Sequence, residues 1–274
     1  LFQYFTGCLI AGLVCLMAFP VWAIDYVGAQ AAGVVGTTSA QTITFTSLTG
    51  GLAAAPAIGD LVVVTWCTGV VGADRSLTIT NASAVDYTLL GSELFADDGY
   101  DTNKRTAYRV MPDPVETQLI LSCVTFGGTC STAQGGTYSI TVFRDVHATP
   151  LEQAVQEGTN LNSILVDPGS ITPVTAGTVV YVSGCGANDL GGTYTSSDLT
   201  DFRAVNGQDN DDSVLGSGYF AWTSGAFNPA TFAGITDSTT FSNAWTIVAF
   251  APAAGGAVSS GGNNCGALML LGVG

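Results

Sequence analysis

The sequence predicts an all-β protein made of two stacked sheets. Runs of β-branched and alternating residues recur from Val27 to Pro252, separated by gaps rich in Gly, Pro, Asn and Asp. After residue 30, no stretch carries a sustained helical period. Two segments also open with nearly the same phrase, GDLVVVTWCTG from Gly59 and GTVVYVSGCGAND from Gly177. Together these features favour one β domain built from two similar halves.

Length and charge limit the function classes. The 274 residues suffice for one large β domain, and only 10% of them are charged. The net charge of −15 repels the phosphate backbone that dominates nucleic-acid affinity, so nucleic acid is excluded as a partner. Because so few residues are charged, the surface must be hydrated mainly through hydroxyl and backbone groups, which is typical of secreted and virion β proteins.

Residues 1–23 form a hydrophobic leader, expected to be helical, with no charge before Asp25. One interpretation is an export signal, in which Pro20 breaks the helix and cleavage follows Ala23. The other is a retained membrane anchor, because the apolar run from Phe5 to Ala23 is about long enough to cross a bilayer. Both interpretations place the protein outside the cytoplasm or at a membrane.

The predicted strands follow in chain order after the leader. Their cores are TITFTSL (42–48), DLVVVTW (60–66), SLTIT (76–80), TQLILSCV (117–124), TYSITVFRDV (137–146), TVVYVSG (178–184) and AWTIVAF (244–250). We expect eight strands in two sheets, which is the jelly-roll count. The two valine-rich strands are expected at central places, buried on both faces.

The similarity between the halves extends beyond the opening phrase. Equivalent features lie 118 residues apart at Gly59 and Gly177, and 115 apart at Asp86 and Asp201. The separation then falls to 111 for Tyr108 and Tyr219, and to 107 for the strands at 137–143 and 244–250. Such a drift is expected where strands are kept and loops vary. The domain at 26–252 therefore divides into halves at about 26–146 and 147–252, unless two Gly-flanked valine runs resemble each other by chance.

Residues 253–274 differ from the rest. A Gly/Ser-rich stretch is followed by the apolar end ALMLLGVG. This region weakly resembles a bacterial C-terminal sorting signal, without the basic end that such signals carry.

Of the seven cysteines, four are candidates for disulfides. Cys123 and Cys130 flank a Gly-rich turn that would bring two antiparallel strands together. Cys67 and Cys185 close the two similar phrases and would pair only if those strands are neighbours; otherwise they are small buried apolar residues. No spacing typical of a zinc site is present.

Two acidic turns are candidate calcium sites, because calcium prefers carboxylate and amide oxygens. Solvated turns would explain the same residues. The candidate ligands are Asp97, Asp98, Asp101, Asn103, Asp209, Asp211 and Asp212. Tyr100, inside the first turn, is the candidate for stacking on a bound carbohydrate. His147 is the only histidine and is expected to face solvent, and no catalytic constellation accompanies it.

Several segments resemble a module found in bacteriophage tail and other virion proteins and in bacterial surface proteins. They are AIGDLVVVTW (57–66), TAYRVMPDPVETQLIL (106–121), YSITVFRDVHATPLEQAV (138–155) and ITPVTAGTVVYVSG (171–184). The resemblance covers about residues 26–252 and implies a jelly-roll-like sandwich without an active site. The chain has Asp145 where the module usually has Gly, and His147 where it usually has Asp.

These features predict an exported, non-enzymatic β-sandwich that acts as a structural or adhesive module at the cell surface. Its loops or an edge strand would serve self-assembly or bind a host surface or glycan, and the membrane would be reached through residues 1–23. One alternative is a virion structural protein such as a tail, spike or decoration subunit. A further alternative is a carbohydrate-binding or carbohydrate-active domain. No cofactor other than calcium is expected.

Overall fold

The computed structural model describes most of the chain between the two apolar ends. The described residues are 23–34, 40–70, 75–96, 101–125, 128–129, 136–161, 163, 165–187, 192–207, 213–235 and 242–253. Within them every regular element is a β-strand, and every strand pair is antiparallel. The all-β prediction is confirmed. The predicted N-terminal helix lies outside the described residues, and within them no helix is long and apolar enough to cross a membrane.

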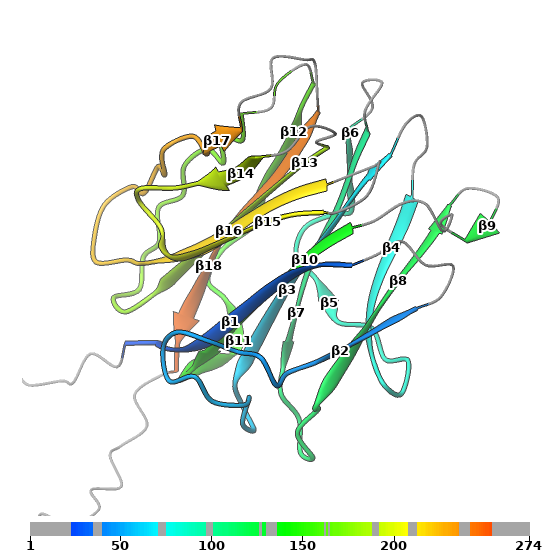
Figure 1. Cartoon of the computed structure of the whole chain (residues 1–274). Coiled ribbons are helices and arrows are strands. Elements are labelled where there is room, and N and C mark those ends of the chain that lie inside the picture. The colour runs from blue at the N-terminus through cyan, green and yellow to red at the C-terminus, as the bar shows by residue number, and fades with distance from the viewer. Residues whose placement is uncertain are drawn as a thin grey trace, which may run out of the picture.

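The first large sheet is formed by the N-terminal half of the chain. Its order is β1-β10-β3-β7-β5, with β6 also beside β7 (Figure 1). The strands are β1 (Asp25–Val34), β3 (Leu61–Val70), β5 (Thr88–Leu89), β6 (Leu94–Ala96), β7 (Asp101–Val110) and β10 (Gly136–Arg144).

The second large sheet is formed by the C-terminal half and has the order β11-β18-β13-β16-β15, with β12 also beside β18. The strands are β11 (Val146–Leu151), β12 (Gln156–Asn160), β13 (Val179–Ala187), β15 (Thr200–Asn206), β16 (Ser213–Ala221) and β18 (Asn243–Pro252). Residues 149–158 belong largely to β11 and β12.

Two smaller sheets cover the outer faces, so the two-sheet expectation was too simple. The first cover sheet has the order β2-β8-β4 with β9 beside β8, and the second pairs β14 with β17. These strands are β2 (Gln41–Thr44), β4 (Arg75–Asn81), β8 (Gln118–Thr125), β9 (Gly128–Thr129), β14 (Gly192–Thr195) and β17 (Ala233–Ile235).

Alternation along β3 explains why each large sheet needs cover on both faces. Successive side chains of a strand point to opposite faces. Val62, Val64 and Trp66 pack into the core beneath the first cover sheet. Leu61 and Val63 face the second large sheet instead. β13 repeats this arrangement, and both strands are central and buried as the sequence predicted.

The two large sheets share one register. On β3, Val63 is paired with Tyr108 and Thr141, and on β13, Tyr181 is paired with Tyr219 and Val248. These partners are separated by the same 118, 111 and 107 residues that separate the similar segments of the sequence. The sequence similarity between the halves therefore coincides with equivalent places in two sheets.

The chain enters and leaves the described body at the same end. Asp25 is paired with Arg144, and Pro252 with Val146. The Ala253 amide donates to the Asp145 carbonyl at 2.7 Å, and Asp145 is the single residue between β10 and β11. The start of β1 and the tip of β18 accordingly lie close together at the lower left of Figure 1. We call this the junction end of the molecule.

Candidate functional site

The contact between the two large sheets is apolar near the junction end. Large side chains from both sheets meet there, and Phe143 lies edge-on to Tyr219 with ring centroids 5.6 Å apart. The layer contains equivalent residues of both halves, such as Leu61 with Val179 and Val63 with Tyr181. Its buried members are Ile24, Leu61, Val63, Leu90, Phe143, Val146, Val179, Tyr181, Val248 and Phe250. Their burial supplies the main attraction between the halves.

Further from the junction end the same contact becomes polar. Thr106, Thr65 and Ser139 form a row of hydroxyl groups across β7, β3 and β10. The Tyr181 hydroxyl, from the opposite sheet, lies 2.9 Å from Thr65 Oγ1 and 3.4 Å from Ser139 Oγ. Burial raises the pKa of Tyr181, and hydrogen bonds with the surrounding hydroxyl groups oppose that rise. The phenol therefore remains protonated and can donate.

The second large sheet contributes an equivalent row of hydroxyl groups. It consists of Ser217, Ser183 and Thr246 on β16, β13 and β18. These positions lie 111, 118 and 107 residues after Thr106, Thr65 and Ser139. Each of the six side chains belongs to a residue that is at most 1% exposed. A doubled layer of buried hydroxyl groups thus fills the middle of the molecule.

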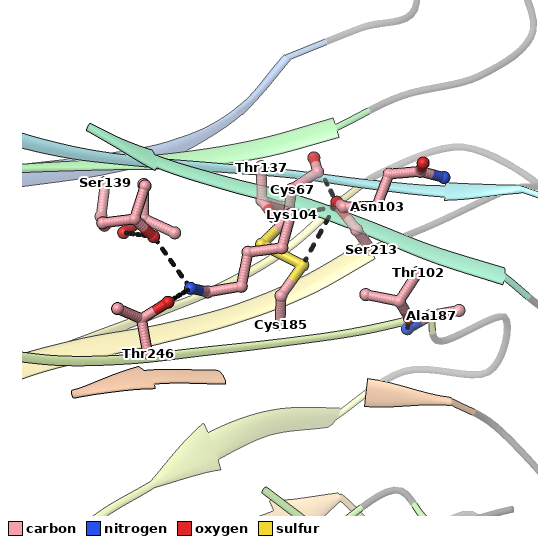
Figure 2. The surroundings of a disulfide bond; sticks show 12 residues. Cys67, Thr102, Asn103, Lys104, Thr137, Ser139, Cys185, Ala187, Ser213 and Thr246 are labelled. Atoms are coloured by element: carbon pink, nitrogen blue, oxygen red, sulfur yellow. Dashed lines mark hydrogen bonds between the residues drawn. A yellow bond between two sulfur atoms is a disulfide. The ribbon is translucent and has the colours of Figure 1, made fainter. Parts of the chain in front are cut away.

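Lys104 extends from β7 into this hydroxyl layer (Figure 2). Its Nζ donates to Thr106 Oγ1 at 2.8 Å and to Thr246 Oγ1 on the opposite sheet. Burial lowers the pKa of Lys104 to about 7, against an opposing influence from Glu157. The place equivalent to Lys104 in the second half is occupied by Leu215, opposite Cys185. Lys104 is therefore a position at which the two halves differ.

A disulfide between Cys67 and Cys185 closes the contact beyond the hydroxyl layer (Figure 2). The Cα atoms are 6.0 Å apart, the residues are 118 apart in sequence, and both are fully buried. The two strands are neighbours across facing sheets rather than within one sheet. Because equivalent residues of the two halves are bonded to each other, the bond lies on the approximate two-fold axis that relates the large sheets.

Hydrogen bonds between the sheets surround the disulfide. Thr137 Oγ1 lies 2.9 Å from Ser213 Oγ, which also donates to the Cys67 carbonyl at 3.2 Å. On the other side of the bond, Thr102 Oγ1 donates to the Ser242 carbonyl at 2.9 Å. We call this region the disulfide end. The halves are thus joined at one end by the chain itself and at the other by Cys67–Cys185.

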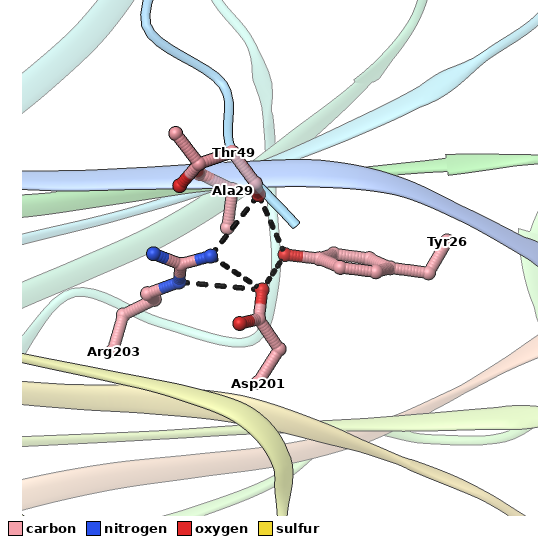
Figure 3. Close-up of polar contacts among 5 residues, drawn as sticks. All are labelled: Tyr26, Ala29, Thr49, Asp201 and Arg203. Carbon is pink, nitrogen blue, oxygen red and sulfur yellow. Dashed lines mark hydrogen bonds and ion pairs between the residues drawn. The ribbon is translucent and has the colours of Figure 1, made fainter. Parts of the chain in front are cut away.

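A cluster of polar side chains joins the two large sheets along one side of their contact (Figure 3). The Tyr26 hydroxyl of β1 donates to the Asp201 carboxylate of β15. Arg203 Nη2 donates to Asp201 Oδ2 at 2.8 Å and to the Thr49 carbonyl at 3.0 Å. Asp201 adopts a φ of 44°, a left-handed conformation that is uncommon outside Gly, Asn and Asp. The cluster ties the first half of the chain to the second.

Most residues proposed as ligands lie outside the described part of the chain. These are Asp97, Asp98, Tyr100, Asp209, Asp211 and Asp212. Asp101 and Asn103 are described, and both are buried in β7 rather than placed in a turn. Among the described residues no group of three or more His, Cys, Asp or Glu side chains could hold a metal ion. The calcium and Tyr100 hypotheses stay predictions.

The remaining candidates are described in part. Cys123 is disulfide-bonded, whereas Cys130 lies outside the described residues, so the Cys123–Cys130 pair stays a prediction. His147 lies half-exposed on β11, and its Nδ1 is 2.8 Å from Thr149 Oγ1.

Sequence reasoning missed the hydroxyl layer and Lys104. A signal was nonetheless present, because Thr65 and Ser183 each precede the cysteine of the repeated phrase by two residues. Residues two apart in a strand point to the same face of the sheet. The hydroxyl group and the sulfur atom of each phrase therefore lie in the same layer.

The chain matches no protein-family model, no curated protein and no solved structure in the comparisons.

Proposed function

We propose that the protein is an exported, non-enzymatic β-sandwich of the jelly-roll type that serves as a structural or adhesive surface module. The buried Cys67–Cys185 disulfide is the observation that carries this proposal. Disulfides form and persist in oxidising compartments outside the cytoplasm. A buried bond that links the two large sheets stabilises a body that must keep its shape after export.

The positions of the chain ends support attachment at one end and presentation of the other. Asp25 and Pro252 both lie at the junction end, beside Asp145. The apolar residues 1–23 directly precede this end of the body, and residues 253–274 directly follow it. A body anchored through either segment would direct its disulfide end away from the anchor. Rigid strands would then position the connecting loops for contact with a partner.

Two ion pairs support a structural role for the charges that form them. Arg144 pairs with Asp60 at 2.8 Å, and Arg203 pairs with Asp201 at 2.8 Å. The first pair joins segments that are distant in sequence, and the second belongs to the polar cluster between the halves. Such charges orient elements of the fold.

Surface labelling of intact cells tests the proposal. An epitope tag is placed within residues 208–212, between β15 and β16, in the full chain produced in a bacterial host. The matched control carries the same tag between Ile58 and Gly59, two exposed residues at the junction end. We expect antibody to label the first variant on intact cells and the control weakly or only after permeabilisation. Thiol-reactive reagent added during lysis should leave Cys67 and Cys185 unmodified.

Labelling of neither variant before permeabilisation, together with modified Cys67 and Cys185, would contradict export. Equal labelling of both variants would retain export and reject the proposed orientation. Recovery of the chain only in phage particles would replace the cell-surface role with a virion role.

A further inference from the structure

A groove opens at the junction end between β7 and the turn that leads into β8. Its volume is about 490 Å³, and its polar lining includes Asn81, Ser83, Arg109, Glu116 and Gln118. Pro112, Pro114 and Val115 supply apolar walls. Among the described residues, no member of the apolar layer between the two large sheets lines this groove. It is therefore distinct from the interface that carries the disulfide.

Glu116 lines the groove and accepts two side-chain hydrogen bonds. Asn81 Nδ2 donates to Glu116 Oε1 at 2.8 Å, and the Tyr87 hydroxyl donates to Glu116 Oε2 at 3.2 Å. Arg109 Nε lies 2.6 Å from Glu116 Oε1 in an ion pair, and its guanidinium carbon is 5.8 Å from the centre of the Tyr87 ring. The side chains of Arg109 and Glu116 are 22% and 11% exposed.

The second half of the chain provides an internal comparison for this groove. Arg109 is paired with Val62 on β3, and Phe220 is paired with Val180 at the equivalent place on β13. Glu116 follows Arg109 by seven residues, and Phe227 follows Phe220 by seven. Phe220 and Phe227 stack with ring centroids 4.1 Å apart and planes at 3°. An ion pair in one half thus replaces a stacked aromatic pair in the other.

This comparison shows that the fold does not require charge at that place. Burying an ion pair is costly in desolvation, and apolar replacements of similar volume are often neutral or stabilising. The second half achieves its packing with two phenylalanines and the nearby Trp222. Recognition of a ligand would explain why the first half, unlike the second, has Arg109, Glu116 and Asn81 beside an open groove.

We propose that this groove binds a neutral saccharide. Guanidinium, carboxylate, amide and hydroxyl groups offer donors and acceptors side by side, which suits the hydroxyl groups of a sugar. The proline and valine walls match the apolar C–H face of a sugar ring. Glu116 neutralises Arg109, and the net charge of −15 repels anionic ligands. This inference does not depend on export or orientation.

The test uses the full chain and soluble neutral oligosaccharides of the cello, malto, xylo and chito series, with acidic uronate oligomers for comparison. Binding is screened on immobilised oligosaccharides, and the strongest binder is titrated by calorimetry. The Arg109→Phe/Glu116→Phe double variant installs the pair found in the second half. We expect it to fold and to bind the neutral oligosaccharide at least tenfold more weakly.

Two control variants separate ligand recognition from folding. Arg105→Met/Glu93→Met removes the ion pair between β7 and the residue before β6, 3.6 Å between charged atoms, and neither residue lines the groove. It should leave saccharide affinity unchanged. Gln118→Ala removes one groove amide and should weaken binding several-fold with little effect on stability. The inference would be overturned if no neutral oligosaccharide bound at millimolar concentration. Unchanged affinity in the double variant, or binding of the acidic oligomers alone, would also overturn it. None of these results bears on surface labelling.

Discussion

Lys104 places a primary amine among six buried hydroxyl groups at the centre of a β protein. Its hydrogen bond to Thr246 joins the two large sheets and its bond to Thr106 stays within β7, yet no carboxylate in the described structure forms an ion pair with it. Burial therefore disfavours the charged form and lowers the pKa to about 7. The amine orients the contact between the sheets at a cost in stability.

Replacing Lys104 with Met should stabilise the protein. In the unfolded chain the lysine pKa is about 10.4, so between pH 7 and that value the unfolded state binds more protons and the stability of the wild type rises with pH. The gain from Lys104→Met should be roughly 1–4 kcal/mol at pH 6 to 7 and should shrink as the pH approaches 10. Chemical denaturation across this pH range measures it. A destabilised variant at pH 6 would contradict the argument.

Asp145 connects the two large sheets with a φ of 60°. Gly adopts this left-handed conformation without strain, since it has no Cβ to clash. Asp145→Gly should leave the free energy of unfolding within about 0.5 kcal/mol of the wild type, or raise it. Asp145→Val should lower it by about 1–2 kcal/mol. Thermal unfolding of both variants is the measurement, and equal effects of Gly and Val would exclude backbone strain as the cause.

The strands β3 and β13 each combine an apolar segment and a polar segment on one face. Leu61 and Val63 precede Thr65 and Cys67, as Val179 and Tyr181 precede Ser183 and Cys185. The apolar segments hold the sheets together at the junction end. Hydroxyl groups are satisfied equally well by water, so at the disulfide end the bond itself holds the sheets together.

Removal of the disulfide should therefore loosen one end of the contact first. The Cys67→Ala/Cys185→Ala variant should lose about 2–5 kcal/mol of unfolding free energy. In hydrogen exchange, amides near Thr65 and Ser183 should lose protection, whereas those near Leu61 and Val179 should keep most of theirs. Uniform loss of protection along both strands would show that the two segments do not differ.

Particular elements show what the sequence could predict and what it could not. The valine runs at 60–66 and 178–184 identified the central strands, because only a strand buried on both faces is apolar at successive positions. The strands at 42–48, 76–80 and 117–124 were expected, but their place in a separate cover sheet was not. Alternation reveals which face of a strand is buried and does not identify the neighbouring strand.

The candidate sites were less predictable than the strands. Asp101 and Asn103 looked like members of an acidic turn, yet pairing with Val70 and Thr68 places them in β7. Pairing with a distant strand, rather than the composition of the neighbouring residues, determined their conformation. The groove at Arg109 was missed because Arg109, Glu116 and Asn81 are brought together only when β4, β7 and the turn before β8 are packed.

At the scale of the whole molecule, the two halves pack like the subunits of a two-fold dimer. β7 faces β18, and their equivalents β16 and β10 face each other in the same way. Only positions on the approximate axis can contact their own equivalents, as Cys67 and Cys185 do. Departures from this symmetry, at Lys104 and at the Arg109 groove, mark where the halves differ in chemistry.

Peptide mapping of the folded, oxidised protein without reduction tests the packing of the two halves. Digestion with pepsin at acid pH, which suppresses disulfide exchange, followed by mass spectrometry should yield a linked pair of peptides containing Cys67 and Cys185. That pairing requires the two repeated strands to face each other at equivalent positions. Free thiols at both residues, or a bond from either one to another cysteine, would contradict the packing of the two halves.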